Sequence, residues 1–198
     1  MDFESCLNYR ILTLLVLTVF YGIYFVKMLI QGGKGIRTHQ IGTKKNGARS
    51  AVEIVMSVAT LGVVLVQLLS VILDWHMLIP TGARFAGFCV GMIGNLLFLV
   101  SVVTMRNSWR AGIPAEDKTE FVSGGIYHFS RNPAFLGFDL MYIGVVLMFF
   151  NPATIAYTLF AIVSLHLQIL REEKYLMGRF GAQYTEYTNH VFRYLGRK

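Results

Sequence analysis

The longest apolar stretch of the chain runs over residues 135–170 and carries one charged side chain, Asp139. As a single helix it would be about 54 Å long at about 1.5 Å per residue, whereas the hydrocarbon core of a bilayer is about 30 Å thick. Asn151-Pro152 lies near its middle, and a proline removes a backbone donor and ends or kinks a helix. The stretch therefore predicts a tight hairpin of two membrane-spanning helices.

Three further apolar stretches are long enough to cross a bilayer, which takes roughly 20 residues in a helix. Only 15% of the residues are charged and 55% are hydrophobic, whereas a soluble domain carries about 25% charged residues. The sequence therefore predicts an all-α fold class: an integral membrane helical bundle of about five transmembrane helices with a cytoplasmic C-terminal helical tail, within one membrane domain over residues 1–198. The predicted spans are residues 11–30, 51–73, 85–105, 135–150 and 153–170.

The distribution of Lys and Arg predicts how these spans are oriented. Loop 31–50 holds five basic residues and no acidic one, and the segment after the third span and the C-terminal tail are also basic. This pattern predicts a multi-pass protein with its N-terminus outside and its C-terminus in the cytoplasm, in a bacterial inner membrane or, in a eukaryote, in the endoplasmic reticulum. Anchoring to the membrane surface explains the net charge of +7 without a nucleic acid partner. Cys6 and Cys89 lie far apart, and this spacing suggests no metal site.

Polar, aromatic and acidic side chains concentrate in segments 107–131 and 171–198, both expected on the cytoplasmic side. Pro133 suits the first turn of a helix, where its missing N–H is not needed. Arg131 then stands at the mouth of the fourth span, where it can meet an anionic group. The hairpin brings Glu172 next to it, and a carboxylate there can accept hydrogen bonds from a ribose or pair with an ammonium.

The same residues form motifs in a recognisable order. A Phe-Val-Ser-Gly-Gly-Ile-Tyr stretch starts at Phe121, and an Arg-Asn-Pro-Ala-Phe-Leu-Gly block starts at Arg131. A Glu-Glu pair starts at Glu172, and a Phe-Gly-Ala-Gln-Tyr-Thr-Glu-Tyr stretch starts at Phe180. Over roughly residues 109–193 this pattern resembles the isoprenylcysteine carboxyl methyltransferase family and its relatives, the phospholipid N-methyltransferases and small bacterial membrane methyltransferases.

The resemblance implies an S-adenosylmethionine-dependent methyltransferase, with residues 106–198 as its catalytic half and residues 11–105 as the first three spans. The methyl acceptor would be lipophilic and would partition into the membrane, and its reacting group could be a carboxylate, an amine or a thiol. Membrane lipids would be the other partners, and no metal is implied. The implied cofactor-binding residues are Thr119, Glu120, Phe121, Val122, Tyr127, Arg131, Asn132, Pro133, Ala134, Phe135, Glu172 and Glu173.

Arg131, Asp139 and Glu172 are the predicted catalytic residues, and Asp139 and Gln168 the predicted substrate residues. An ionisable side chain inside a span is expensive and by default functional, so Asp139 could orient an amine or thiol acceptor or take its proton. Gln168 stands where the resemblance implies, for prenylcysteine methyltransferases, an arginine that holds a carboxylate. This departure favours an amine, a thiol or a neutral hydroxyl as the acceptor.

Other interpretations remain open at this stage. The Glu172-Glu173 pair could be a solvated helix end, and Trp109 reads as an anchor at the membrane interface. Tyr184 and Tyr187 are expected chiefly to pack the tail helix onto the membrane surface and not to contact a ligand. The alternative functions are an NADPH-dependent reductase of sterol-like lipids and a non-enzymatic membrane scaffold or transporter.

Overall fold

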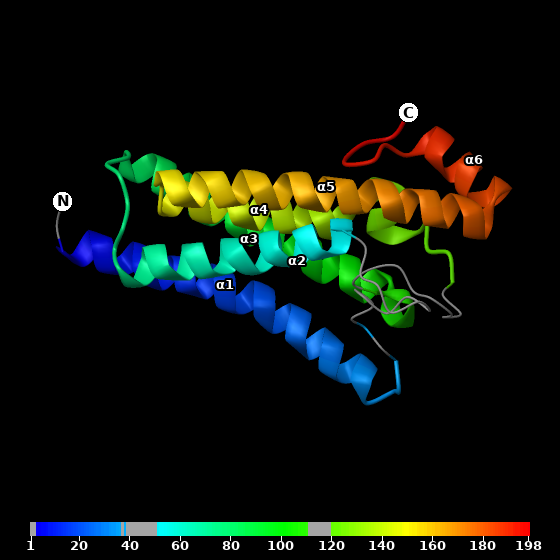
Figure 1. The fold of residues 1–198 in the computed structure, drawn as a ribbon, viewed down its shortest axis with the longest axis horizontal. Helices are drawn as coiled ribbons and strands as arrows, with labels where there is room; N and C mark the ends of the chain where they lie inside the picture. The colour runs from blue at the N-terminus through cyan, green and yellow to red at the C-terminus, as the bar shows by residue number, and fades with distance from the viewer. Residues whose placement is uncertain (1–2, 37, 39–50, 111–119) are drawn as a thin grey trace.

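The computed structural model describes residues 3–36, 38, 51–110 and 120–198, and within these residues it contains helices and no strand. Five long helices lie side by side, and a short sixth helix follows them at one end of the bundle (Figure 1). Two single turns of 3-10 helix, η1 and η2, lie between the third and fourth helices. The bounds are α1 (Phe3–Gly32), α2 (Ala51–Ile72), α3 (Thr81–Thr104), η1 (Arg106–Ser108), η2 (Gly125–His128), α4 (Pro133–Met148), α5 (Pro152–Phe180) and α6 (Ala182–His190).

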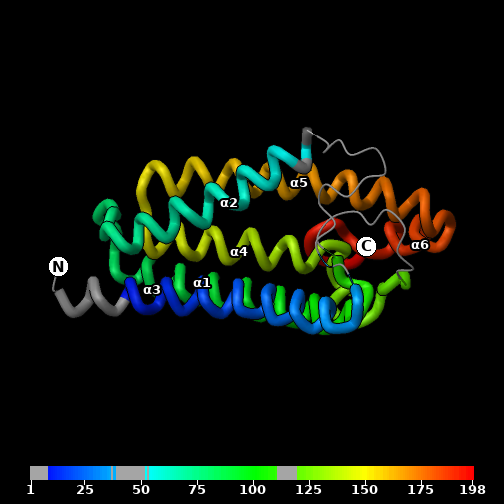
Figure 2. The backbone as a smooth tube through the Cα atoms, turned by 60° about the horizontal axis from the view of Figure 1, so that its bottom comes forward, coloured from blue at the N-terminus to red at the C-terminus, as the bar shows by residue number. Residues whose placement is uncertain are grey.

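The five predicted spans are confirmed as helices, although α1 begins well before and α5 ends well after the predicted bounds. Among the described residues, α1, α2, α3 and α5 are long and apolar enough to cross a membrane. Helix α4 is shorter, with 16 residues, but it is apolar as well. It lies in the middle of the bundle, between α2 and α5 on one side and α1 and α3 on the other (Figure 2). The chain is thus built as a multi-pass membrane protein.

The predicted hairpin between the last two spans is confirmed at Asn151. The Asn151 Oδ1 atom accepts a hydrogen bond from the Thr154 backbone N–H at 2.9 Å, and the Thr154 hydroxyl accepts one from the Asn151 N–H at 3.2 Å. This reciprocal cap satisfies two backbone donors at the start of α5, and Pro152 occupies the first turn, where no donor is needed.

Helix α5 continues past the predicted end of the fifth span at residue 170. It ends only at Phe180, where Gly181 adopts a positive φ of 51°, a conformation that glycine adopts without strain. Glu172 and Glu173 therefore lie inside the helix and do not follow it.

Glycines allow α3 and α4 to pack with their backbones almost in contact. A Cβ atom built on Gly144 would lie 2.5 Å from the backbone nitrogen of Gly91, and one built on Gly137 would lie 2.9 Å from the carbonyl oxygen of Gly94. Small residues at such positions permit close helix packing in membranes. This packing fixes the position of α4, and with it the residues at its start.

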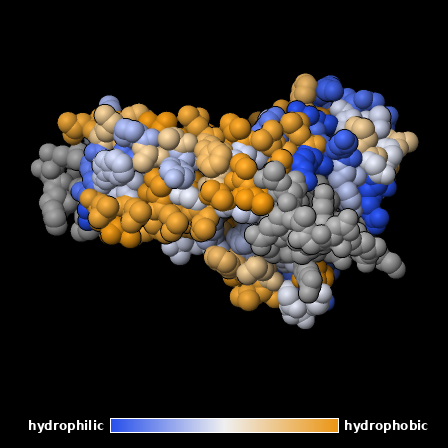
Figure 3. Space-filling view, viewed as in Figure 1, coloured by the Kyte–Doolittle hydropathy of each residue, from blue (hydrophilic) through white to orange (hydrophobic). Residues whose placement is uncertain are grey.

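The surface of the molecule divides along the length of the bundle. On the face drawn in Figure 3, hydrophobic side chains cover most of the helical bundle, whereas the end with α6 is mainly hydrophilic. We call α6 together with residues 191–198 the polar end. The C-terminus lies at this end and α1 begins at the opposite one (Figure 1), as an odd number of spans requires.

Candidate functional site

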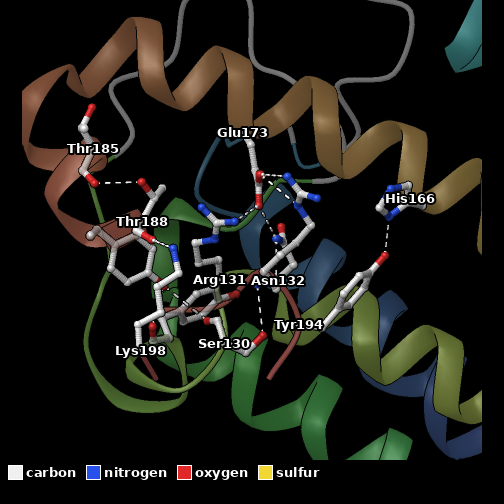
Figure 4. A network of polar contacts seen from close by, with 12 residues as sticks. Ser130, Arg131, Asn132, His166, Glu173, Thr185, Thr188, Tyr194 and Lys198 are labelled. Atoms are coloured by element: carbon white, nitrogen blue, oxygen red, sulfur yellow. Dashed lines mark hydrogen bonds and ion pairs between the residues drawn. The ribbon is translucent and has the colours of Figure 1, made fainter. Parts of the chain in front are cut away.

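The site is built around the buried carboxylate of Glu173, which is 8% exposed. Its Oε1 atom accepts a hydrogen bond from Asn132 Nδ2 at 3.0 Å and lies 3.3 Å from Arg131 Nη2 (Figure 4). Its Oε2 atom accepts two hydrogen bonds from Arg193, from Nε at 3.1 Å and from Nη2 at 3.0 Å. Buried charges are tolerated when they are paired and hydrogen-bonded in this way. The interpretation of the Glu pair as a solvated helix end is therefore wrong for Glu173.

The C-terminal tail adds backbone hydrogen-bond acceptors to this network. The Arg131 backbone N–H donates to the Phe192 carbonyl oxygen at 3.1 Å, and Asn132 Nδ2 also donates to the Arg193 carbonyl oxygen at 3.2 Å. The hydrogen bonds to Glu173 raise the pKa of Arg193. Residues after α6, which the sequence did not single out, therefore hold the segment that begins α4.

A cavity of about 130 Å³ lies next to this network. Residues before α4, at its start, in the last turns of α5 and in α6 line it together. Arg131 is one of them, and its buried Nε atom has no hydrogen-bond partner within the described part of the chain. The predicted cofactor-binding residues that line this cavity are Glu120, Phe121, Val122, Tyr127, Arg131, Asn132, Ala134, Phe135 and Glu172.

The remaining predicted site residues lie elsewhere. Pro133 is buried in the first turn of α4. Glu173 does not line the cavity but forms an ion pair with Arg131 and accepts a hydrogen bond from Asn132, which both line it. Asp139 is 8% exposed and lines neither this cavity nor the larger one described below. Its Oδ1 atom has no hydrogen-bond partner among the described residues. Thr119 lies outside the described residues. The roles assigned to these residues stay predictions.

Aromatic residues that the sequence did not assign to the site contribute to it. Tyr184 and Tyr187 of α6 pack against the ring of Phe121, with centroid distances of 5.9 Å and 5.3 Å, and they also line the cavity. The Tyr187 hydroxyl donates to the Tyr127 carbonyl oxygen at 2.5 Å. Burial raises the pKa of both Tyr127 and Tyr187, so their hydroxyls stay protonated. Their spacing of three in a short helix was the signal that they share one face.

Trp109 is not an anchor at the membrane interface, because it is only 4% exposed. Its ring packs edge-on against Tyr24 and Phe98, at centroid distances of 5.5 Å and 6.0 Å. His166 of α5 contacts the C-terminal tail, with Nδ1 at 2.5 Å from the Tyr194 hydroxyl (Figure 4). Trp109 therefore belongs to the inner wall of the site, whereas His166 contacts the tail.

A second, larger cavity of about 710 Å³ adjoins the first. It is lined mainly by apolar and aromatic side chains of α1, α2, α4 and α5, for example Tyr21, Val64, Phe138 and Leu165. Gln168 also lines it, is 1% exposed, and donates a hydrogen bond from Nε2 to Glu172 Oε1 at 2.9 Å. The residues that line both cavities are Trp109, Arg110, Ala134, Phe135 and Glu172.

The two cavities differ in chemistry and share one wall. The smaller has Arg131, Asn132 and Glu172 among its lining, together with Tyr184 and Tyr187 of α6, and we call it the polar cavity. The larger lies among the apolar helices. A polar ligand in the first and a lipophilic ligand in the second would meet beside Phe135 and Glu172.

Comparison with known proteins confirms the resemblance found in the sequence. Residues 86–178 match the family model of the isoprenylcysteine carboxyl methyltransferase family. The chain is 39% identical over 108 residues to a protein-S-isoprenylcysteine O-methyltransferase of Saccharomyces cerevisiae, a match that covers 53% of this chain and 45% of that protein. It is 30% identical over 108 residues to the protein-S-isoprenylcysteine O-methyltransferase of Tribolium castaneum, covering 53% of this chain and 38% of that protein.

A similar match is found with a plant protein. The chain is 31% identical over 110 residues to a probable protein-S-isoprenylcysteine O-methyltransferase of Oryza sativa subsp. indica, covering 54% of this chain and 58% of that protein. The matches thus span between 38% and 58% of the relatives' own lengths. The residues matched by the family model include those that form the two cavities' shared wall at the start of α4.

Proposed function

We propose that this protein is an S-adenosylmethionine-dependent methyltransferase that modifies a lipophilic acceptor taken from the bilayer. One observation carries the proposal: a polar cavity at the hydrophilic end and an apolar cavity among the spanning helices share a wall that contains Phe135 and Glu172. A reaction between a water-soluble donor and a membrane-dissolved acceptor needs such a meeting point. The named activities of the relatives from yeast, beetle and rice support the same reaction type.

The side chains of the polar cavity fit the cofactor's functional groups. The unpaired Nε–H of Arg131 is a donor for a carboxylate, and Glu172 is an acceptor for an ammonium or a ribose hydroxyl. Tyr127 and Phe135 present aromatic rings, which attract a sulfonium cation by cation–π interaction. The polar cavity holds about 130 Å³, which is less than the roughly 300–1,000 Å³ of most ligand pockets. We infer that the cofactor also uses space along the shared wall.

When bound, S-adenosylmethionine supplies an electrophilic methyl group on a positively charged sulfur. The chain's own contribution is positioning and the exclusion of water, which can supply a large part of the acceleration of a displacement reaction. Trp109, buried between the cavities, and Phe135 restrict water at the shared wall. Glu173 keeps Arg131 and Asn132 in place without taking part in the reaction.

The proposed orientation places the polar end in the cytoplasm, where the cofactor is made, and the N-terminus on the other side. The membrane would be the inner membrane of a bacterium or the endoplasmic reticulum of a eukaryote. The basic loop 31–50 supports this orientation through the charge rule for short loops.

Cofactor binding by the purified protein in lipid nanodiscs tests the proposal. We expect isothermal titration calorimetry to give a micromolar dissociation constant for S-adenosylmethionine, about −8 kcal/mol, and no heat with NADPH. We also expect transfer of a labelled methyl group to a component of a lipid extract. Binding of NADPH without S-adenosylmethionine would instead identify a reductase, and binding of neither would favour a scaffold or transporter.

A further inference from the structure

Three residues that line the apolar cavity carry a buried polar atom without a hydrogen-bond partner among the described residues: Tyr21, Tyr142 and Gln168. Of these, Gln168 is the one that contacts Glu172, which lines both cavities. Gln168 lines this cavity and is 1% exposed. Its amide NH₂ group faces the Glu172 carboxylate, with Nε2 at 2.9 Å from Oε1. Because a carboxylate only accepts hydrogen bonds, this contact fixes the orientation of the amide. The other amide atom, Oε1, is buried and has no hydrogen-bond partner among the residues that the structure describes.

A buried carbonyl oxygen without a partner is uncommon in native proteins and calls for an explanation. One explanation is that a molecule bound in the apolar cavity donates a hydrogen bond to this oxygen. Gln168 lies one helical turn before Glu172, which lines both cavities, so such a donor group would sit beside the shared wall.

The charges around this position disfavour an anionic group. Gln168 donates its hydrogen bond to Glu172, which is itself a carboxylate. Among the described residues that line the apolar cavity, the only guanidinium is that of Arg110, which donates to the carbonyl oxygens of Asn107 at 2.5 Å and Trp109 at 2.9 Å. A carboxylate beside Gln168 would face a like charge and an acceptor oxygen, both unfavourable in a low-dielectric environment.

We propose that the acceptor is an apolar molecule whose reacting group is a thiol, an amine or a hydroxyl that donates a hydrogen bond to Gln168 Oε1. This proposal rests on the methyl transfer proposed above and names its substrate class. The lone pair of the acceptor's sulfur, nitrogen or oxygen forms the new bond to the methyl carbon, and the electron pair of the broken carbon–sulfur bond remains on the cofactor's sulfur. The acceptor's proton passes to the Glu172 carboxylate.

The test uses one apolar tail with different head groups. Farnesyl thiol, farnesylamine and farnesol are compared with N-acetyl-S-farnesylcysteine, which carries a carboxylate. Their binding to the protein in nanodiscs, without cofactor, is measured by the shift in melting temperature across a concentration series. We expect the uncharged thiol and hydroxyl and the amine to bind about tenfold tighter than the carboxylate or better, since one hydrogen bond is worth about one factor of ten.

Three variants sharpen the test. Gln168→Leu, which keeps the volume but removes the carbonyl oxygen, should weaken binding of the three donors about tenfold and leave the carboxylate unchanged. Gln168→Arg supplies a cation and should reverse the preference. Arg110→Gln should not change the order of affinities. If Gln168→Arg does not fold, the loss of donor binding in Gln168→Leu alone tests the proposal.

Tighter binding of N-acetyl-S-farnesylcysteine by the wild-type protein, lost in Arg110→Gln, would overturn the proposal. Equal affinities of the donors for wild-type and Gln168→Leu protein would overturn it as well. The titration with S-adenosylmethionine, run on the wild-type protein, keeps the two proposals apart. If the cofactor binds and the carboxylate is preferred, only the substrate class is wrong, whereas failure of the cofactor to bind would contradict the methyltransferase itself.

Discussion

Arg193, in the C-terminal tail, donates two hydrogen bonds to Oε2 of Glu173 in the last two turns of α5, at 3.1 Å and 3.0 Å. The other oxygen of the same carboxylate holds Arg131 and Asn132. One buried carboxylate thus connects the end of the chain to the residues that line the polar cavity. The tail is therefore part of the structure of the site and is not only a cover for α5.

This connection predicts that Arg193→Ala weakens cofactor binding although Arg193 does not line the cavity. Loss of its hydrogen bonds leaves Glu173 partly unpaired and free to draw Arg131 closer. Hydrogen bonds to charged groups are worth about 1.5–3 kcal/mol, and the Arg193 side chain is 36% exposed, so we expect a loss near the lower end of that range. Calorimetry with S-adenosylmethionine measures it.

Arg197→Ala is the matched control, because Arg197 lies in the same tail and contacts His128 at the surface. We expect its cofactor affinity to equal that of the wild-type protein. An equal loss in both variants would mean that the tail acts only through its overall stability.

The close approach of α3 and α4 predicts a large effect of a small substitution. A Cβ atom on Gly144 would lie 2.5 Å from the Gly91 nitrogen, which is backbone and cannot move aside, whereas a Cβ atom on Gly22 meets nothing within 4 Å. We expect Gly144→Ala to lower the free energy of unfolding by about 1–3 kcal/mol, the usual cost of overpacking, and Gly22→Ala to have almost no effect. Melting curves of both variants in one detergent make the comparison, and similar melting temperatures would contradict the packing.

The sequence predicted the helices well because bilayer thickness and Pro152 leave few alternatives. It predicted the end of α5 less well, since apolar periodicity stops at residue 170 although the helix has no reason to end before Gly181. The burial of Glu173 depends on Arg193, a contact between distant segments that no local pattern encodes.

In the site, too, features set by the local sequence could be predicted, whereas features set by contacts between distant segments could not. The Arg-Asn-Pro block could be placed from the sequence, because Pro133 fixes where α4 begins. The burial of Trp109 between two aromatic rings could not, because it depends on how α1 and α3 pack. Asp139 lies in the predicted span but lines neither cavity, so its proposed part in proton transfer stays a prediction.

The orientation of the bundle predicts which ends are accessible to a charged thiol reagent. Leu78 lies between α2 and α3 and is 87% exposed, and Lys198 lies at the polar end. In a background with Cys6 and Cys89 replaced by serine, we expect Lys198→Cys to react only from the cytoplasmic side and Leu78→Cys only from the opposite side. Reaction of both from one side would rule out five spans.

Glu172 lines both cavities, so its substitution tests the proposed site most directly. We expect Glu172→Ala to weaken S-adenosylmethionine binding by about 1.5–3 kcal/mol, the range for a hydrogen bond to a charged group. Glu172→Gln keeps the shape and can still accept a hydrogen bond from Gln168, so it should retain more affinity than the alanine variant. Because its amide cannot take a proton from the acceptor, it should still lose most of the methyl transfer.

Glu186→Ala is the control for this series, because Glu186 is a carboxylate on the neighbouring helix α6 whose side chain is 71% exposed and pairs with His190 across one turn. Calorimetry gives the affinities, and single-turnover methyl transfer at saturating cofactor gives the chemical step. Unchanged cofactor affinity in Glu172→Ala would remove Glu172 from the cofactor site. Full turnover in Glu172→Gln would show that another group takes the acceptor's proton, and Asp139→Asn would then be the variant to measure next.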